Sequence, residues 1–199
     1  FQNYDFHNLY KELLNFCTVD LSAFYFDIRK DVLYCDPVNS KKRESTLLML
    51  NIILISLLKW FAPILAFTTE EIYQLISKKN KSIHLEKFLD YPKKFENIKL
   101  NDKWNHLLKI RDICNISIEE KRGNKEIGSS LEAALIVKLN THNQKLIQGI
   151  DLSELCITSS VIVKNSEKKD VEVETNKAEG IKCPVCWKFS KEPCSRHKS

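Results

Sequence analysis

The chain has very little glycine and no segment that would bind phosphate through its backbone. Only four of its 199 residues are glycine, and they stand far apart, which excludes a P-loop or a dinucleotide-binding turn. Met49 is the single methionine, and the first residues lack the pattern of a signal peptide. A start at Phe1 without methionine predicts a piece of a longer protein.

Arrangements of catalytic side chains are also missing. No Ser-His-Asp or Cys-His arrangement has local support in the sequence. Glu70-Glu71 and Glu119-Glu120 stand at predicted helix ends, where solvated charge is the ordinary explanation for paired carboxylates. Four histidines are scattered over predicted helices and loops: His7, His84, His106 and His142. We therefore assign no catalytic residue to this chain.

The overall composition is that of an ordinary globular protein of one or two domains, with 43% hydrophobic and 29% charged residues. The formal net charge of +5 is compatible with a polyanionic partner without requiring one. Seven cysteines without a secretion signal predict a reducing, cytoplasmic compartment. Four of the cysteines lie in apolar or mixed surroundings and are expected to be small buried hydrophobes: Cys17, Cys35, Cys114 and Cys156.

The other three cysteines form the most informative pattern in the sequence. Cys183 and Cys186 make a C-x2-C pair, and Cys194 with His197 makes a second pair of the same spacing. Four soft ligands in two such pairs predict one closed tetrahedral zinc site, which is structural because no coordination position stays open. A disordered lysine-rich tail with reactive thiols is the alternative. It does not explain why three of seven cysteines fall within twelve residues.

A long apolar run between Leu47 and Phe67 raises the question of a membrane span. Asn51, Lys59 and Pro63 interrupt the run, and the uncharged part is shorter than the roughly 20 residues that a spanning helix needs. The polar residues Glu44, Asn51 and Lys59 recur at helical spacing, so the pattern favours the central helix of a bundle, covered on most sides by neighbours.

Hydrophobic periodicity predicts a mainly α chain that ends in a smaller mixed unit. Asp20 or Ser22 is expected to cap the second helix, and Thr68-Thr-Glu-Glu71 has the pattern of a capping box for the fourth. The predicted helices are residues 3–17, a short helix from about 20 to 35, 42–61, 68–77 and 101–122, with an extended loop over 78–98.

The pattern changes after Gly123-Asn124. Strand-like runs cover 131–139 and 156–163, a short helix is expected within 142–150, and 171–174 alternates as an edge strand would. The predicted organisation is a helical bundle over 1–124, a small α+β unit over 125–176 and a metal-binding tail over 177–199.

Several stretches of the sequence resemble one family in the expected order. Residues 15–36 (NFCTVDLSAFYFDIRKDVLYCD) and 61–72 (FAPILAFTTEEI) are similar to the anticodon-binding helical domain of bacterial isoleucyl-tRNA synthetase. Ile110-Arg-Asp112 followed by 127–133 (IGSSLEA), and then 179–188 (EGIKCPVCWK), resemble its later helix and its C-terminal zinc element. The first stretch separates the isoleucyl enzymes from the valyl and leucyl ones, whereas Pro-x-x-x-Phe-Thr-x-Glu-x-Ile is shared by all three.

The resemblance implies a class I ligase that joins isoleucine to its tRNA with ATP. The signatures His-Ile-Gly-His and Lys-Met-Ser-Lys-Ser are absent here, so ATP and Mg²⁺ belong to a catalytic domain outside this sequence, as does editing. The second ligand pair of the family is usually Cys-x-x-Cys, whereas this chain has Cys194-Ser-Arg-His197 after a short gap. Histidine is a competent zinc ligand, so the site is preserved chemically.

Independent of the resemblance, the tail has properties that suit RNA. Residues 180–199 hold five cations (Lys182, Lys188, Lys191, Arg196 and Lys198) against Glu192, and three thiolates with one zinc ion add only one negative charge. The Trp187 ring could stack on an unpaired anticodon base for about 1–3 kcal/mol, or pack back on the α+β unit to anchor the tail. Four arginines of the predicted helices are candidates for phosphate contact, or else ordinary solvated charges: Arg29, Arg43, Arg111 and Arg122.

Two functions therefore follow from the sequence. The first is the tRNA-docking C-terminal region of a monomeric isoleucine–tRNA ligase, with the anticodon stem-loop as partner and no membrane contact. The second is a free-standing zinc-stabilised helical module that binds other proteins.

Overall fold

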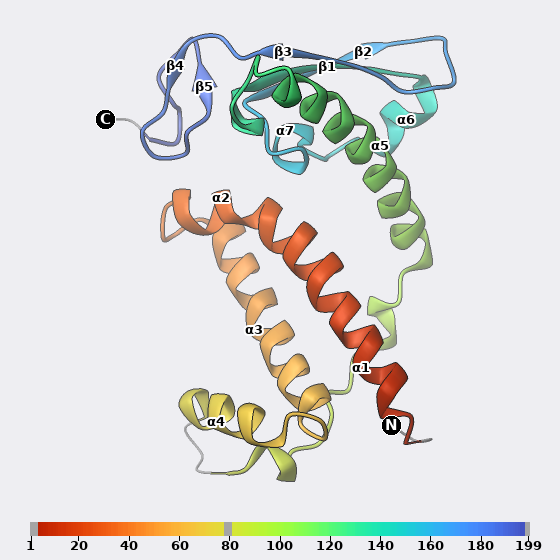
Figure 1. Ribbon diagram of the computed structural model, residues 1–199, viewed down its shortest axis with the longest axis vertical. Helices are drawn as coiled ribbons and strands as arrows, with labels where there is room; N and C mark the ends of the chain where they lie inside the picture. Colours follow the sequence, from red (N-terminus) through yellow and green to blue (C-terminus); the bar gives the residue numbers. More distant parts are fainter. Residues whose placement is uncertain (1–3, 78–80, 198–199) are drawn as a thin grey trace. The chain divides into compact units, whose positions relative to one another are not determined.

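The computed structural model of the chain describes residues 4–77 and 81–197. Its internal contacts divide the chain into two compact units, Phe1–Phe95 and Glu96–Ser199 (Figure 1). The first unit is helical. The second combines one long helix with a small sheet and a hairpin that carries a Cys/His cluster, so the predicted mainly α fold class is confirmed.

The first unit opens with one uninterrupted helical path from Phe6 to Cys35. It consists of α1 (Phe6–Asn15), the π-helical segment η1 (Phe16–Phe26) and α2 (Asp27–Cys35), and the backbone stays right-handed helical at both junctions. The expected separate helix with a cap at Asp20 or Ser22 is wrong. No glycine or proline lies in this stretch, so nothing in the backbone ends the helix before Asp36-Pro37.

The central helix of this unit is α3 (Lys41–Phe61), as predicted to within one residue. Ser40 caps it by accepting a hydrogen bond from the Arg43 amide at 3.4 Å, and Pro63 follows its end. The next helix, α4 (Ala66–Ile76), begins before the predicted capping box. The Thr69 hydroxyl lies inside the helix and donates to the Leu65 carbonyl at 2.9 Å, so it does not act as a cap.

The sequence predicted that neighbouring helices would cover most sides of α3, and this is not found. Only Thr46, Ser56 and Leu58 of this helix are buried, and α2, α4 and the turn after α4 are among the elements that contact it. By length and composition alone this helix could cross a membrane, and 22% of its most apolar 18-residue stretch is buried. Five large apolar side chains of α3 are exposed: Leu47, Leu48, Met49, Ile52 and Leu54.

Glu70 fixes part of the segment that was predicted to be an extended loop. Its carboxylate accepts hydrogen bonds from the Ile83 amide and the Ser82 hydroxyl, both at 2.9 Å, and so fixes the 3₁₀ turn η2 (Ile83–Leu85). A second 3₁₀ turn, η3 (Lys93–Phe95), follows. Ile83 inserts into the small core of this unit, which consists of Leu58, Ala62, Tyr73 and Ile83.

The second unit is built on α5 (Ile98–Gly123), which the sequence predicted to within three residues at its start. The Asn97 side chain caps it through the Leu100 amide at 3.0 Å, and Asn124 closes its end. This helix packs on the sheet of its own unit, and so it belongs with the residues that follow it. The predicted boundaries near residues 124 and 176 stay predictions.

The sheet has three strands in the order β2-β1-β3, with β1 (Ala133–Leu139) in the centre. β2 (Ser160–Asn165) runs parallel to β1, and β3 (Glu172–Lys177) runs antiparallel to it along the other edge. The side chains of β1 alternate, so that one face is fully buried. That face and α5 share one core, formed by Ile110, Cys114, Ile118, Ile127, Ala133, Leu135, Val137, Leu139 and Cys156.

Short elements complete this unit. The turn η4 (Ser130–Glu132) leads into β1, and α6 (Thr141–Leu146) with α7 (Leu152–Leu155) forms the crossover to β2. The predicted short helix is α6, whereas α7 was not expected.

Of the four cysteines expected to be buried, Cys114 and Cys156 are buried, and Cys17 and Cys35 are only half-buried.

Candidate metal centre and nucleic-acid interface

A two-stranded hairpin positions the ligand residues. β4 (Ile181–Lys182) pairs antiparallel with β5 (Phe189–Ser190), and the C-x2-C turn lies between them. The turn is closed by a hydrogen bond from the Cys183 amide to the Lys188 carbonyl at 2.9 Å, and by one from the Trp187 amide to the Cys183 carbonyl at 3.0 Å. We call residues 180–197 the knuckle.

Gly180 is the residue that lets the knuckle close. Its φ is +108°, and a Cβ built there would lie 2.2 Å from the Ser190 carbonyl oxygen, far inside a normal contact. Only glycine combines this backbone conformation with so close an approach of the opposite strand.

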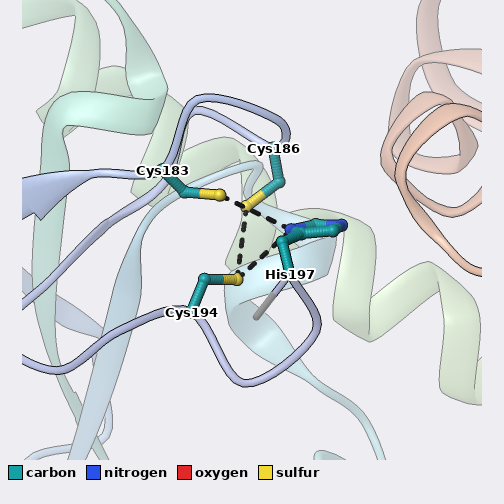
Figure 2. Close-up of side chains that lie close together, drawn as sticks. All are labelled: Cys183, Cys186, Cys194 and His197. Carbon is teal, nitrogen blue, oxygen red and sulfur yellow. Dashed lines mark hydrogen bonds between the residues drawn. The ribbon is translucent and has the colours of Figure 1, made fainter. Parts of the chain in front are cut away.

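The four predicted ligands lie together and point at one another (Figure 2). Their ligand atoms are all within 4.8 Å of each other. Cys186 Sγ lies 3.9 Å from Cys194 Sγ, and His197 Nδ1 lies 3.5 Å and 3.3 Å from the sulfurs of Cys183 and Cys194. Ideal zinc bond lengths in a tetrahedron give about 3.8 Å between two sulfurs and about 3.5 Å between sulfur and nitrogen. The cluster therefore fits a metal ion of that size with no further ligand.

Backbone amides of the knuckle lower the pKa of two of the three thiols. The amides of Cys186 and Val185 point at the Cys183 sulfur and lower its pKa to about 6. Burial acts to raise the pKa of Cys194, but the amides of Arg196 and His197 outweigh it and lower that pKa. Burial raises the pKa of Cys186, the most enclosed of the three thiols. Two of the three thiols are thus biased towards the thiolate that a metal requires.

The knuckle is attached to the sheet of its own unit through Ser159, which immediately precedes β2. The Phe189 amide donates to the Ser159 hydroxyl at 2.7 Å, and that hydroxyl donates in turn to the Leu131 carbonyl of η4. The chain entering the knuckle is held at the same turn, because the Ala178 amide donates to the Glu132 carbonyl at 2.7 Å.

Asp151 caps α7 and lies within electrostatic range of Lys188 of the knuckle. Burial acts to raise the pKa of the Asp151 carboxyl, but hydrogen bonds from Ser153 and Glu154, with a smaller effect from the charge of Lys188, lower it.

Trp187 is the exposed aromatic residue of the knuckle. Its φ of +62° turns the chain directly after the ligand Cys186, and 59% of the residue is open to solvent. The Lys182 ammonium lies over the ring at 5.3 Å from its centre. The ring is thus largely exposed to solvent, and the structure brings it together with a cation.

The remaining candidates for RNA contact have local partners or lie elsewhere in the chain. Arg111 Nε donates to the Leu155 carbonyl at 3.0 Å, which ties α5 to α7, and Arg122 forms an ion pair with Glu119 at 2.6 Å. Arg29 stacks over the Tyr25 ring at 5.8 Å, and Arg43 is half-buried on α3. Arg196 is half-buried beside the ligand His197, and Lys198 lies outside the described residues.

The sequence predicted the four side chains that the structure brings together, but not the residues that hold the knuckle in place. Nothing in the local sequence connects Ser159 or Asp151 with the knuckle. Gly180 alone carried a usable signal, because a glycine three residues before a C-x2-C pair in a glycine-poor chain predicts a special backbone conformation.

Comparison with known proteins agrees with this architecture. The family model described as the anticodon-binding domain of tRNA ligase matches residues 1–138, which is more than half of the chain. The chain therefore belongs to this family. The match ends within β1, so the knuckle lies beyond it.

Curated relatives extend the similarity through the knuckle. The chain is 64% identical over 197 residues to the isoleucine–tRNA ligase of Pelagibacter ubique, covering 99% of this chain and 22% of that protein. It is 43% identical over 190 residues to the isoleucine–tRNA ligase of Methylacidiphilum infernorum, covering 96% of the chain and 20% of the relative. The enzyme of that name from Agrobacterium fabrum is 38% identical over 198 residues, covering 94% and 20%. The resemblance seen in the sequence is confirmed, and the chain spans about a fifth of the length of these relatives.

Proposed function

We propose that this chain is the tRNA-docking, anticodon-binding C-terminal region of a cytoplasmic, monomeric isoleucine–tRNA ligase. The observation that carries the proposal is the 64% identity to an isoleucine–tRNA ligase over 197 residues, which includes the knuckle. In this reading the parent enzyme attaches isoleucine to tRNA with ATP and Mg²⁺ in a domain outside this sequence. The chain itself supplies binding and no catalytic residue.

One structural zinc ion is the metal that the knuckle suits best. Three sulfurs and one imidazole nitrogen are a zinc ligand set, and the spacing of these atoms matches a zinc tetrahedron. The ligands are Cys183, Cys186, Cys194 and His197. Zinc content measured after gentle purification should approach one equivalent, and less than about half an equivalent would count against the site.

The anticodon loop is the proposed ligand of the knuckle surface. RNA loops offer unpaired bases that stack on aromatic rings, and phosphates that attract cations. Trp187 offers an exposed ring and Lys182 a cation beside it. Stacking of one base on such a ring contributes about 1–3 kcal/mol. Lys188, Arg196 and the four helix arginines Arg29, Arg43, Arg111 and Arg122 are proposed to add phosphate contacts.

The test is a binding titration over a series of salt concentrations. The chain is titrated with isoleucine tRNA and with the same tRNA carrying an altered anticodon. Preference for the cognate loop, with affinity that falls as salt rises, is the expected result. Equal and feeble binding of both RNAs would refute the proposal and favour a protein-interaction module.

A substitution series tests the stacking surface itself. Trp187→Ala should weaken binding of the cognate tRNA by about fivefold to about 100-fold, and Trp187→Phe should restore part of it. Ile181→Ala is the matched control, because Ile181 is an exposed apolar residue of the same hairpin without an aromatic ring. Equal effects of Trp187→Ala and Ile181→Ala would contradict the stacking role.

A further inference from the structure

One peptide group joins the ligand-bearing turn to the sheet. The carbonyl of Lys188 and the amide of Phe189 belong to the same planar unit, so they point in opposite directions. The carbonyl accepts from the Cys183 amide at 2.9 Å, inside the turn, and the amide donates to the Ser159 hydroxyl at 2.7 Å, outside it. The orientation of this one plane is therefore fixed from both sides.

Ser159 is itself held in a defined position. Its amide donates to the Ala133 carbonyl at 3.0 Å, at the start of the central strand, and its hydroxyl proton is directed to the Leu131 carbonyl. Because that proton is used there, the oxygen lone pairs face Phe189 and can accept. Alanine at this position would remove both bonds and leave a partly buried amide and a carbonyl without them.

We infer that Ser159 is a positioning residue that locks the knuckle on the sheet and so fixes the direction in which Trp187 and Lys182 face the RNA. Trp187 stands two residues before Phe189, with Lys188 between them, and Lys182 pairs with Phe189 across the hairpin. A movement of the hairpin away from Ser159 would therefore move the ring and the cation together.

The consequence for binding rests on the proposed function. A knuckle that samples several orientations is competent to bind for only part of the time, and its apparent affinity falls by that fraction. Of the two hydrogen bonds lost, the one from the Phe189 amide holds the knuckle itself, so loss of the Ser159 hydroxyl should weaken RNA binding by about three- to tenfold. Zinc binding should not change, because Ser159 contributes no ligand atom.

The first measurement needs no RNA. Amide hydrogen exchange is followed in the zinc-loaded chain for Ser159→Ala, for Ser159→Thr, which keeps a hydroxyl, and for the neighbour control Ser160→Ala. Exchange of the Phe189 amide should rise about tenfold or more in Ser159→Ala, with zinc content unchanged, and stay near the unmodified rate in the other two. Unchanged exchange of that amide in Ser159→Ala would overturn the inference.

The second measurement asks whether orientation matters for RNA. Isoleucine tRNA is titrated against Ser159→Ala, Trp187→Ala and the double variant. The Ser159→Ala effect should shrink to less than about twofold in the Trp187→Ala background, because the serine acts through the ring. Fully additive effects, or unchanged RNA affinity of Ser159→Ala, would overturn the orienting role. If the unmodified chain itself fails to bind, the proposed function falls, while the exchange data still decide whether Ser159 locks the knuckle.

Discussion

Gly180→Ala should weaken metal binding although residue 180 contributes no ligand. A Cβ at this position would lie 2.2 Å from the Ser190 oxygen and 2.7 Å from the Lys191 nitrogen, both of which are backbone atoms that no side-chain rotation can clear. The φ of +108° adds strain for any residue other than glycine. The opposite strand must therefore move, and it carries the chain towards the ligands Cys194 and His197.

The size of the effect follows from two contributions. A rarely populated backbone conformation costs about 1–3 kcal/mol. Forcing an extra methyl into a filled space costs about 1–3 kcal/mol more. Because metal binding and closure of the hairpin are coupled, the sum of about 2–6 kcal/mol can appear in the metal affinity. At about 1.4 kcal/mol for each tenfold change, zinc affinity should fall by at least about 30-fold.

The assay is a competition titration of zinc between the chain and a chromophoric chelator. Gly149→Ala is the matched control, since Gly149 also has a positive φ of +77° but a Cβ there would meet nothing within 4 Å. That variant should bind zinc within about twofold of the unmodified chain, because a Cβ at residue 149 displaces no neighbouring atom. Zinc affinity of Gly180→Ala within about twofold of the unmodified chain would refute the reasoning.

Three further predictions concern the thiols and the two cores. Ultraviolet thiolate absorbance of the metal-free chain should show a step near pH 6 that Cys183→Ser abolishes, and its persistence in that variant would assign the thiolate elsewhere. Ile118→Ala should lower the free energy of unfolding of the second unit by about 2–5 kcal/mol in denaturant titrations, because Ile118 is fully buried beneath the sheet, whereas exposed Ile116→Ala should change it little. The pKa of Glu70 is lowered from 4.5, chiefly by the Gln74 side-chain hydrogen bond, so its stabilising effect on the first unit is present above the unfolded pKa and is lost as the pH falls through the folded pKa. When thermal midpoints are measured as a function of pH, Glu70→Gln should reduce the loss of stability towards acid pH. An unchanged loss would show that Glu70 is not its cause.

Patterns within one element were predictable from the sequence. The period of apolar residues located α3 and α5 to within a few residues, and Pro63 and Gly123-Asn124 stand where the structure ends these two helices. The clustering of the three cysteines with His197 was predictable for the same reason, because two residues spaced by x2 converge whatever surrounds them.

Features that depend on contacts distant in sequence were not predictable. The cap expected at Asp20 or Ser22 failed because a polar side chain can lie on a helix surface as easily as at its end. The 3₁₀ turn at Ile83 depends on Glu70, thirteen residues away, and the attachment of the knuckle depends on Ser159, thirty residues before Phe189. A serine hydroxyl carries no local signal for such a role.

The turn η4 holds the knuckle at two points, through Glu132 for the chain that enters it and, by way of Ser159, through Leu131 for Phe189 in β5. Because both attachments meet at η4, weakening them should affect the rates of association with a polyanion and of dissociation from it differently. Long-range attraction depends on the sum of charges, which a loosened attachment leaves unchanged, so encounter rates with a polyanion should stay nearly constant. Lifetimes of the bound state depend on the ring and the cation keeping their alignment, so weakening the attachments should shorten residence times.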